Sequence, residues 1–459
     1  MKNYRLEILL FLLVWLVYGL SINSRNLDAF NLQQMGVESI VERRSFYVEG
    51  SRTPQLQPRG DVFDYQGHKY AAKQPGQFLT GAPVYFFLRL LGLSYFKHYL
   101  MTSALVTFFT ASLVTALSAV ALYRLTTRLV KAGSSPFWPV GIALLYAVGT
   151  TMFPYAGIAH HDAIASAFLA IAFCLMFHLG RDSAKGRTPL LHALGAGLFL
   201  GLTVTTSMLA FWPALAVSLY FLSLGRLRLL PYLLLGGLAG LAPLLIYDAV
   251  SFGNPFLLPN VAGNYSDTFL HLKWDNFTSK LGFYLKWAAL YSPVLLIGLG
   301  GLSLLPRSFR REKLAAAGAV AILCAYIFNI DTVGTCQYGP RYLLPVMAFG
   351  CLGLAGFSYL ESGRARLFSV AVIALVGWAS FIVNAVGAAH GAMYCDLGRH
   401  AFWPYLASIR RGESASFPLF SWLFISTMIC IYLFIKLLTE GEAQPKELST
   451  TARRSKKPG

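Results

Sequence analysis

The chain has 459 residues, of which 56% are hydrophobic and 13% are charged, whereas about 25% of residues are charged in a typical soluble domain. This balance excludes a soluble enzyme and indicates a polytopic membrane protein. A formal charge of +18 would suggest nucleic-acid binding in a soluble chain, but the inner loops of membrane proteins collect Lys and Arg. We therefore expect no nucleic-acid partner.

The apolar runs predict the fold class. The first run, residues 6–22, follows Lys2 and Arg5 without a small-residue cleavage site, so we interpret it as a retained span and not a signal peptide. A span needs about 20 apolar residues, and the chain predicts an all-α protein with about 12 transmembrane helices. The twelve runs are 6–22, 99–122, 137–153, 160–179, 190–206, 208–224, 229–250, 287–305, 314–330, 342–360, 367–388 and 418–438.

A shorter run, residues 77–93, carries Arg89. If it does not cross, every short basic loop lies on the side of the N-terminus, as the positive-inside rule requires. We therefore interpret 77–93 as a juxtamembrane helix in the interface, within a first outer loop of residues 23–98. Residues 1–438 then form one transmembrane domain, and the polar segment 439–459 is predicted to be a disordered cytoplasmic tail.

The outer loops hold the acidic candidates. Asp28, which five residues separate from the first span, lies where a carboxylate could act as general base on an acceptor hydroxyl. The alternative is an ordinary solvated acid, and Asp61 and Asp64 are rival bases in a segment that has the composition of a turn.

His160, His161 and Asp162 open the fourth span. They predict a divalent-metal or phosphate site, whereas the alternative for Asp162 is a helix cap favoured by the dipole. Because adjacent side chains point in different directions on a helix, we expect at most one histidine to join the carboxylate.

Two cations are candidates for phosphate binding. Lys73 precedes the juxtamembrane helix, and Arg341 follows a Gly-Pro turn at the start of a span. Either can donate charge-assisted hydrogen bonds to a phosphate. The alternatives are a snorkelling lysine and an anchoring arginine.

Of six scattered cysteines, Cys336 and Cys395 are the two in predicted outer loops. The sequence shows no metal-ligand spacing among the cysteines. We predict a Cys336–Cys395 disulfide if the compartment is oxidising, which requires Cα atoms within about 7 Å.

Together these residues resemble the GT-C superfamily of membrane glycosyltransferases, in the bacterial branch related to protein O-mannosyltransferases (family 39) and aminoarabinose transferases. Asp28 matches the acid of the family's first outer loop, and Asp162 resembles its second-loop acid. Lys73-Gln74-Pro75 resembles a Lys-Pro-Pro segment, with Gln in place of the first proline. Asp28 lacks the neighbouring acid of the family's Asp-Glu pair, because Ala29 follows it.

The resemblance implies sugar transfer from a polyprenyl-phosphate-linked donor to a lipid, glycan or protein acceptor, by inverting displacement at the outer face of a bacterial inner membrane. In this hypothesis Asp28 is the base, and Lys73 and Arg341 bind the donor phosphate. Asp162 with His160 or His161 orients the acceptor or binds a divalent metal ion, the one cofactor considered. A flippase or a polymerase of lipid-linked glycans is the alternative, although transporters usually keep ionisable groups near the midplane of the membrane.

Overall fold

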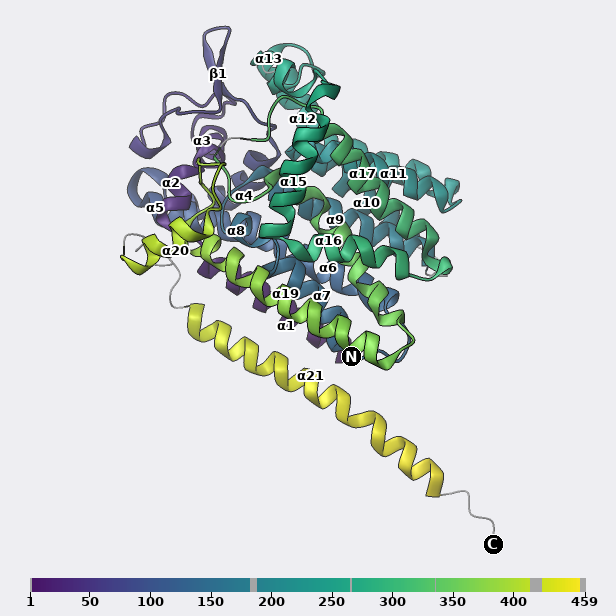
Figure 1. The fold of residues 1–459 in the computed structure, drawn as a ribbon. Helices are drawn as coiled ribbons and strands as arrows, with labels where there is room; N and C mark the ends of the chain where they lie inside the picture. Colours follow the sequence, from purple (N-terminus) through teal and green to yellow (C-terminus); the bar gives the residue numbers. More distant parts are fainter. Residues whose placement is uncertain (1, 182–187, 265, 335, 413–422, 455–459) are drawn as a thin grey trace.

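The computed structural model describes residues 2–181, 188–264, 266–334, 336–412 and 423–454. These residues are mostly helical, with one two-stranded sheet (Figure 1). The α-helices are α1 Lys2–Leu20, α2 Ser24–Ala29, α3 Leu32–Glu38, α4 Gly76–Leu90, α5 Tyr95–Thr107, α6 Leu113–Leu129, α7 Phe137–Val148, α8 Met152–Ala156, α9 His161–Arg181, α10 Thr188–Thr206, α11 Met208–Ser223, α12 Leu230–Phe252, α13 Pro259–Ala262, α14 Ser266–Phe269, α15 Phe277–Tyr291, α16 Pro293–Gly301, α17 Arg310–Ile327, α18 Met347–Leu352, α19 Gly363–His390, α20 Phe402–Arg410 and α21 Leu423–Arg454. Tighter or wider helical turns include η1 Ser39–Arg43, η3 Phe108–Ser112, η8 Arg341–Val346 and η9 Gly353–Tyr359.

Six continuous helical segments are long and apolar enough to cross a membrane, or seven if one bent pair counts as a single span. These findings support an integral membrane protein. The predicted apolar runs fall largely on helices, but α7, α11 and Leu423–Thr439 are shorter apolar helices, and α17 begins with four charged residues. The predicted count of twelve spans is therefore not confirmed.

One predicted run, residues 287–305, is not a straight helix. The axis bends by 102° between the helical segments Trp274–Tyr291 and Pro293–Leu304. Ser292 between them has φ −145° and ψ 55°, because a proline disfavours the α conformation of the residue before it. The Ser292 hydroxyl accepts a hydrogen bond from the Thr151 amide at 3.0 Å, so the break also joins α16 to the chain before α8.

Small residues allow helices α10 and α12 to pack closely. A Cβ atom added to Gly197 would lie 2.0 Å from the carbonyl oxygen of Leu233, and one added to Gly236 would lie 2.0 Å from that of Leu194. Helices within membranes often associate through such backbone contacts. The Gly197 and Gly236 positions therefore fix the spacing of this pair.

The molecule has two distinct ends. Figure 1 shows the hairpin, α2, α3 and α13 at one end, and the N-terminus and the end of α21 at the other. Arg124 of α6 pairs with Glu7 of α1 at 2.6 Å, and Arg181 of α9 pairs with Glu312 of α17 at 3.1 Å. Each pair joins two segments that are far apart in the sequence.

The all-α prediction missed a hairpin. Strands β1 Val62–Tyr65 and β2 His68–Ala71 pair antiparallel, with Tyr65 opposite His68. Gln66 and Gly67 make the two-residue turn with φ of 49° and 81°, as a type I′ turn requires. The Ala72 amide donates to the Asp61 carbonyl at 2.7 Å, so Asp61 and Lys73 flank the base of the hairpin.

Helix α4 covers much of the predicted juxtamembrane helix, residues 77–93. It buries Phe78 and Tyr85 against the molecule and leaves Phe86, Phe87 and Leu90 more than half exposed. A helix with a large exposed apolar face suits a position in the membrane interface. At the other end of the chain, α21 is helical to Arg454, which differs from the disorder predicted for 439–459. Ala, Glu, Lys and Leu in this segment are good helix formers.

Candidate active site

Asp162 lies in the first turn of α9 and is buried, with 2% of its side chain exposed. Its Oδ1 accepts a hydrogen bond from the Ser207 hydroxyl at 2.7 Å. Its Oδ2 lies 3.6 Å from the Arg341 Nε. Ser207 is not among the residues that the sequence predicts for a site, although a serine between the apolar runs 190–206 and 208–224 marks the break between α10 and α11.

Arg341 is held at the start of η8. Its Nη1 lies 3.2 Å from the His160 Nε2, and its guanidinium carbon lies 5.3 Å from the centre of the Tyr342 ring. The turn before it depends on Gly339, which has φ 71° and no room for a side chain: an added Cβ would lie 2.7 Å from the Thr151 side chain. The guanidinium is thus fixed by the protein groups around it.

Two adjoining cavities share Lys73, His161 and Arg341. The smaller, about 40 Å³, is also lined by Asp162 and Ser207. The larger, about 400 Å³, adds His160, Asp61 and Arg59. We call this pair of cavities the reaction site. Five predicted residues, Lys73, His160, His161, Asp162 and Arg341, therefore come together, although they are far apart in the sequence.

Asp28 does not join them. It is exposed at the end of α2 and lines neither cavity, whereas Ala29 and Phe30 line the larger one. Partial desolvation raises the pKa of its carboxyl above the usual value. Helix α2 is held by the Asn23 cap and by the Tyr99 hydroxyl, which donates to the Leu27 carbonyl. This orientation of α2 could not be read from the position of Asp28 in the sequence.

Asp61, the rival base, does line the larger cavity. Its Oδ1 lies 3.5 Å from the Lys73 Nζ, and 65% of its side chain is exposed. Asp61 has φ 42°, a left-handed conformation that Asp tolerates better than most residues. Asp64 instead pairs with Lys69 across the hairpin at 2.9 Å, away from both cavities.

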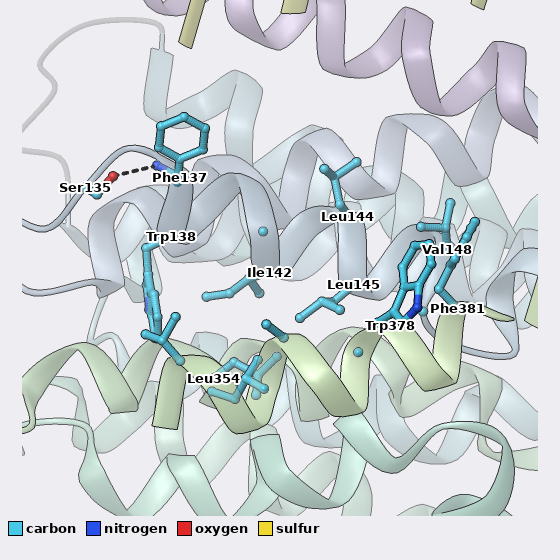
Figure 2. Close-up of a pocket in the computed structure, with 16 residues that line it drawn as sticks. Ser135, Phe137, Trp138, Ile142, Leu144, Leu145, Val148, Leu354, Trp378 and Phe381 are labelled. Carbon is cyan, nitrogen blue, oxygen red and sulfur yellow. Dashed lines mark hydrogen bonds between the residues drawn. The ribbon is translucent and has the colours of Figure 1, made fainter. Parts of the chain in front are cut away.

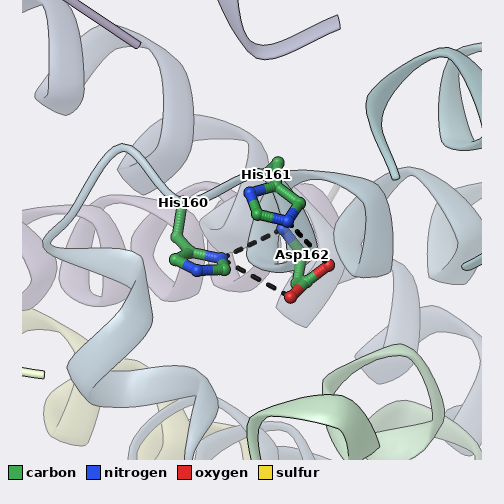
Figure 3. Close-up of side chains that lie close together, drawn as sticks. All are labelled: His160, His161 and Asp162. Carbon is green, nitrogen blue, oxygen red and sulfur yellow. Dashed lines mark hydrogen bonds and ion pairs between the residues drawn. The ribbon is translucent and has the colours of Figure 1, made fainter. Parts of the chain in front are cut away.

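The His160–His161–Asp162 cluster is tighter than predicted (Figure 3). One candidate ligand atom from each residue lies within 4.8 Å of the others, and the two imidazole rings stack 4.4 Å apart. The expectation that at most one histidine would face the carboxylate was wrong, because His160 precedes α9 and is free of the helical spacing.

The surroundings of this cluster suit an anion better than a metal ion. The Arg341 guanidinium already lies beside both Asp162 and His160, and the Ser207 hydroxyl donates a hydrogen bond to the Asp162 Oδ1. A divalent cation would meet a fixed positive charge at short range, which is strongly unfavourable in a buried site. The residues therefore do not fit the divalent metal that the sequence analysis considered.

The predicted disulfide is confirmed. Cys336 and Cys395 are bonded, with Cα atoms 3.9 Å apart. Beside the bond, the Gln337 amide donates to the Tyr394 carbonyl at 2.8 Å. Cys336 lines the larger cavity, so the bond ties the segment before Arg341 to the segment after α19.

A separate cavity of about 670 Å³ lies between α7, η9 and α19 (Figure 2). Its walls are apolar, with Trp138, Leu145, Trp378 and Phe381 among them, and its described lining holds no ionisable side chain. It offers no charged group to bind a phosphate or to move a proton, so the polar pair of cavities is the candidate active site.

The chain has the GT-C fold that the sequence predicts. This is shown by its similarity to two crystal structures of ArnT from Cupriavidus metallidurans. The form bound to undecaprenyl phosphate matches with a TM-score of 0.53 and 15% identity, and the apo form with 0.50 and 17%. Each match covers 95% of this chain and 76% of ArnT. No family model and no curated protein sequence matches the chain.

Proposed function

We propose that this protein transfers a sugar from a polyprenyl-phosphate-linked donor to an acceptor at the outer face of a bacterial inner membrane. The observation that carries the proposal is the meeting of Lys73 and Arg341 in one reaction site beside two acids. The likeness of the fold to an ArnT structure that contains undecaprenyl phosphate supports a polyprenyl phosphate as the donor carrier.

The two cations bind the donor phosphate. Arg341 presents a planar fork of N–H groups that matches phosphate oxygens, and Lys73 adds a point charge. When the sugar leaves its carrier, negative charge grows on that phosphate. Fixed cations stabilise this charge without having to rearrange, which lowers the barrier.

Asp61 is the general base. It takes the proton of an acceptor hydroxyl as the hydroxyl oxygen attacks the anomeric carbon. The bond from that carbon to the phosphate oxygen breaks on the opposite face, and the electron pair leaves with the lipid phosphate. This displacement inverts the anomeric centre. Binding of the phosphate to Lys73 releases Asp61 from its 3.5 Å ion pair, so donor binding prepares the base.

Asp162 and its histidines position Arg341. Asp162 keeps the guanidinium in place through Oδ2, while Ser207 holds Oδ1. His161 lies at the cavity wall with its Nε2 3.4 Å from Asp162, where it can orient the acceptor. The role of Asp162 is therefore to orient Arg341, whereas the base is Asp61, which lines the larger cavity.

Two arguments support an outward-facing site: the distribution of basic loops and the source of the sugar donor. Asp61 and Lys73 flank the base of the hairpin, and the hairpin lies at the end opposite the N-terminus (Figure 1). Basic loops stay cytoplasmic, which puts the N-terminal end inside. Nucleotide sugars are made inside the cell, so an outward site needs a sugar that has crossed the membrane on a lipid.

The test is transfer by the purified protein in lipid nanodiscs, with a radiolabelled polyprenyl-phosphate hexose as donor. We expect donor binding and slow release of labelled sugar to water, both lost in Lys73→Ala and Arg341→Ala proteins. A flippase would instead move the intact lipid between leaflets and leave the bond to the sugar unbroken. Translocation of unhydrolysed donor by both variants would reject the transferase.

A further inference from the structure

A second polar cavity, of about 470 Å³, lies outside the reaction site. We call it the cap cavity. It lies between the segment that follows η1, strand β2 and the end of α12, and its lining includes Arg43, Arg44, Tyr47, His68, Tyr70 and Ser251. Neither Lys73 nor Arg341 reaches it, so it serves some other group than the donor phosphate.

One wall of the cap cavity is aromatic and rigid. The rings of Tyr47 and His68 stack 4.3 Å apart with only 13° between their planes. The His68 Nδ1 lies 2.8 Å from the Glu49 carboxylate, which fixes the imidazole. Flat ring faces with polar edges accept a partner that is apolar on one face and polar at its rim. A sugar ring has this character.

Another wall is cationic. Arg43 uses Nη1 on Glu38 at 2.7 Å, while its Nε and Nη2 have no hydrogen-bond partner among the described residues. Arg44 is exposed and adopts the left-handed conformation, with φ 52°. Such a conformation costs free energy and is often kept for a functional reason. No acid belongs to the described lining of the cap cavity. Glu38 pairs with Arg43 from behind the wall, so Arg44 is the cation that an anion in the cavity would meet.

The cap cavity lies close to the reaction site. Tyr70 lines the cap cavity, and Lys73 lines both cavities of the reaction site. Three residues of chain span at most about 11 Å. One short oligosaccharide can therefore occupy the cap cavity and still present a hydroxyl to Asp61.

We propose that the cap cavity binds the glycan part of the acceptor, and that this glycan carries a carboxylate or phosphate group. A sugar ring packs on Tyr47 and Tyr70, and its acidic group is bound by Arg44, with the positive charge of Arg43 beside it. This inference rests on the proposed transferase activity for its purpose, but the binding it describes can be measured without any transfer.

The test uses the full-length protein in nanodiscs without donor. Binding of glucuronic acid, glucose 6-phosphate and methyl glucoside is measured by saturation-transfer NMR. We expect the two acidic sugars to bind at least about tenfold more tightly than the neutral one. Arg44→Asn, which suits the left-handed backbone, should abolish that preference, and Tyr47→Ala should weaken all three sugars. Arg52→Gln, an exposed arginine of the same loop, is the matched control and should bind like the wild type.

The proposal is overturned if Arg44→Asn retains the acidic preference, or if the wild type binds none of the three sugars. It is also overturned if inorganic phosphate binds as tightly as glucose 6-phosphate, because the ring would then add nothing. Binding of a polyprenyl-phosphate hexose to the wild type is measured in parallel. If the acidic sugars bind and this donor does not, the transferase proposal fails while the cap cavity stands.

Discussion

Arg341 is positioned from two sides by the protein itself. Asp162 and His160 hold its guanidinium, and a glycine without space for a side chain sets the turn that presents it. Such preorganisation is expected of a group that stabilises charge in a transition state. The same contacts show why a lysine could not replace it, since a single ammonium lacks the planar fork.

We predict that Arg341→Lys weakens donor binding by about tenfold or more, because a charge-assisted fork of hydrogen bonds is lost. Equilibrium binding of a fluorescent polyprenyl-phosphate hexose measures the effect. Arg399→Lys, at an exposed surface ion pair with Asp396, should bind like the wild type. Equal affinity in Arg341→Lys and the wild type would remove Arg341 from the phosphate site.

The choice of base can be decided by comparing three carboxylates. Asp61→Asn should lower turnover by about 10²–10⁴-fold and leave donor affinity within about twofold. Asp64→Asn, in the same hairpin but paired with Lys69, is the control and should retain activity. If Asp28→Asn abolishes transfer while Asp61→Asn does not, the base is Asp28, and α2 must turn toward the cavity during catalysis.

At the level of elements, the close contact between α10 and α12 predicts that a larger side chain at this interface lowers stability. Gly236→Val places atoms where the Leu194 carbonyl lies, so α10 and α12 must separate. We expect a loss of roughly 1–3 kcal/mol, seen as a lower melting temperature in detergent. Gly300→Ala, at a position with open space around the Cβ, should melt within a degree or two of the wild type. Equal melting of both variants would contradict the packing described for this pair.

The disulfide joins two elements at the reaction site. Replacing Cys336 and Cys395 by alanine should cost roughly 3–5 kcal/mol, since the bond closes a loop of 59 residues. Because Cys336 lines the cavity beside Arg341, donor affinity should fall as well. Cys324→Ala, at a free cysteine, controls for the loss of a thiol. Unchanged donor affinity in the double variant would mean that the bond stabilises the fold without shaping the site.

At the scale of the whole molecule, the two ends predict the topology. Reporter fusions after Arg128 and after Ser266 should report opposite sides of the membrane, with residue 128 cytoplasmic. Fusions that report the same side would reject this topology and turn the reaction site away from the proposed face.

The sequence predicted what depends on composition and short spacing. Apolar runs fall on helices because a segment buried in lipid needs apolar side chains and a backbone whose hydrogen bonds are satisfied within the helix. Arg341 was predicted from the Gly-Pro turn before it. The disulfide followed from assigning two cysteines to one side. The sequence could not predict the direction in which α2 faces, because packing around Asn23 and Tyr99 sets it. That is why Asp28 was preferred to Asp61.

Three further differences between the predicted and the observed structure have causes in short stretches of the chain. The hairpin was taken for a turn because its strands have only four residues each, and Gly67 was the one clear signal of its type. The bend at Ser292 was marked by Pro293, but the run around it is apolar enough to be read as one span. The stacking of His160 on His161 depends on where α9 begins, which sequence patterns locate poorly.

The bond between Cys336 and Cys395 also sets an order of assembly. Arg341 is synthesised before Cys395, so the segment that carries the arginine cannot be locked until α19 has been made and its far end has reached the same side of the membrane. Maturation of the reaction site is thus a late step that follows insertion of the helices. If the reaction site faces an outer, oxidising compartment as proposed, formation of this bond depends on the thiol-oxidising capacity of that compartment.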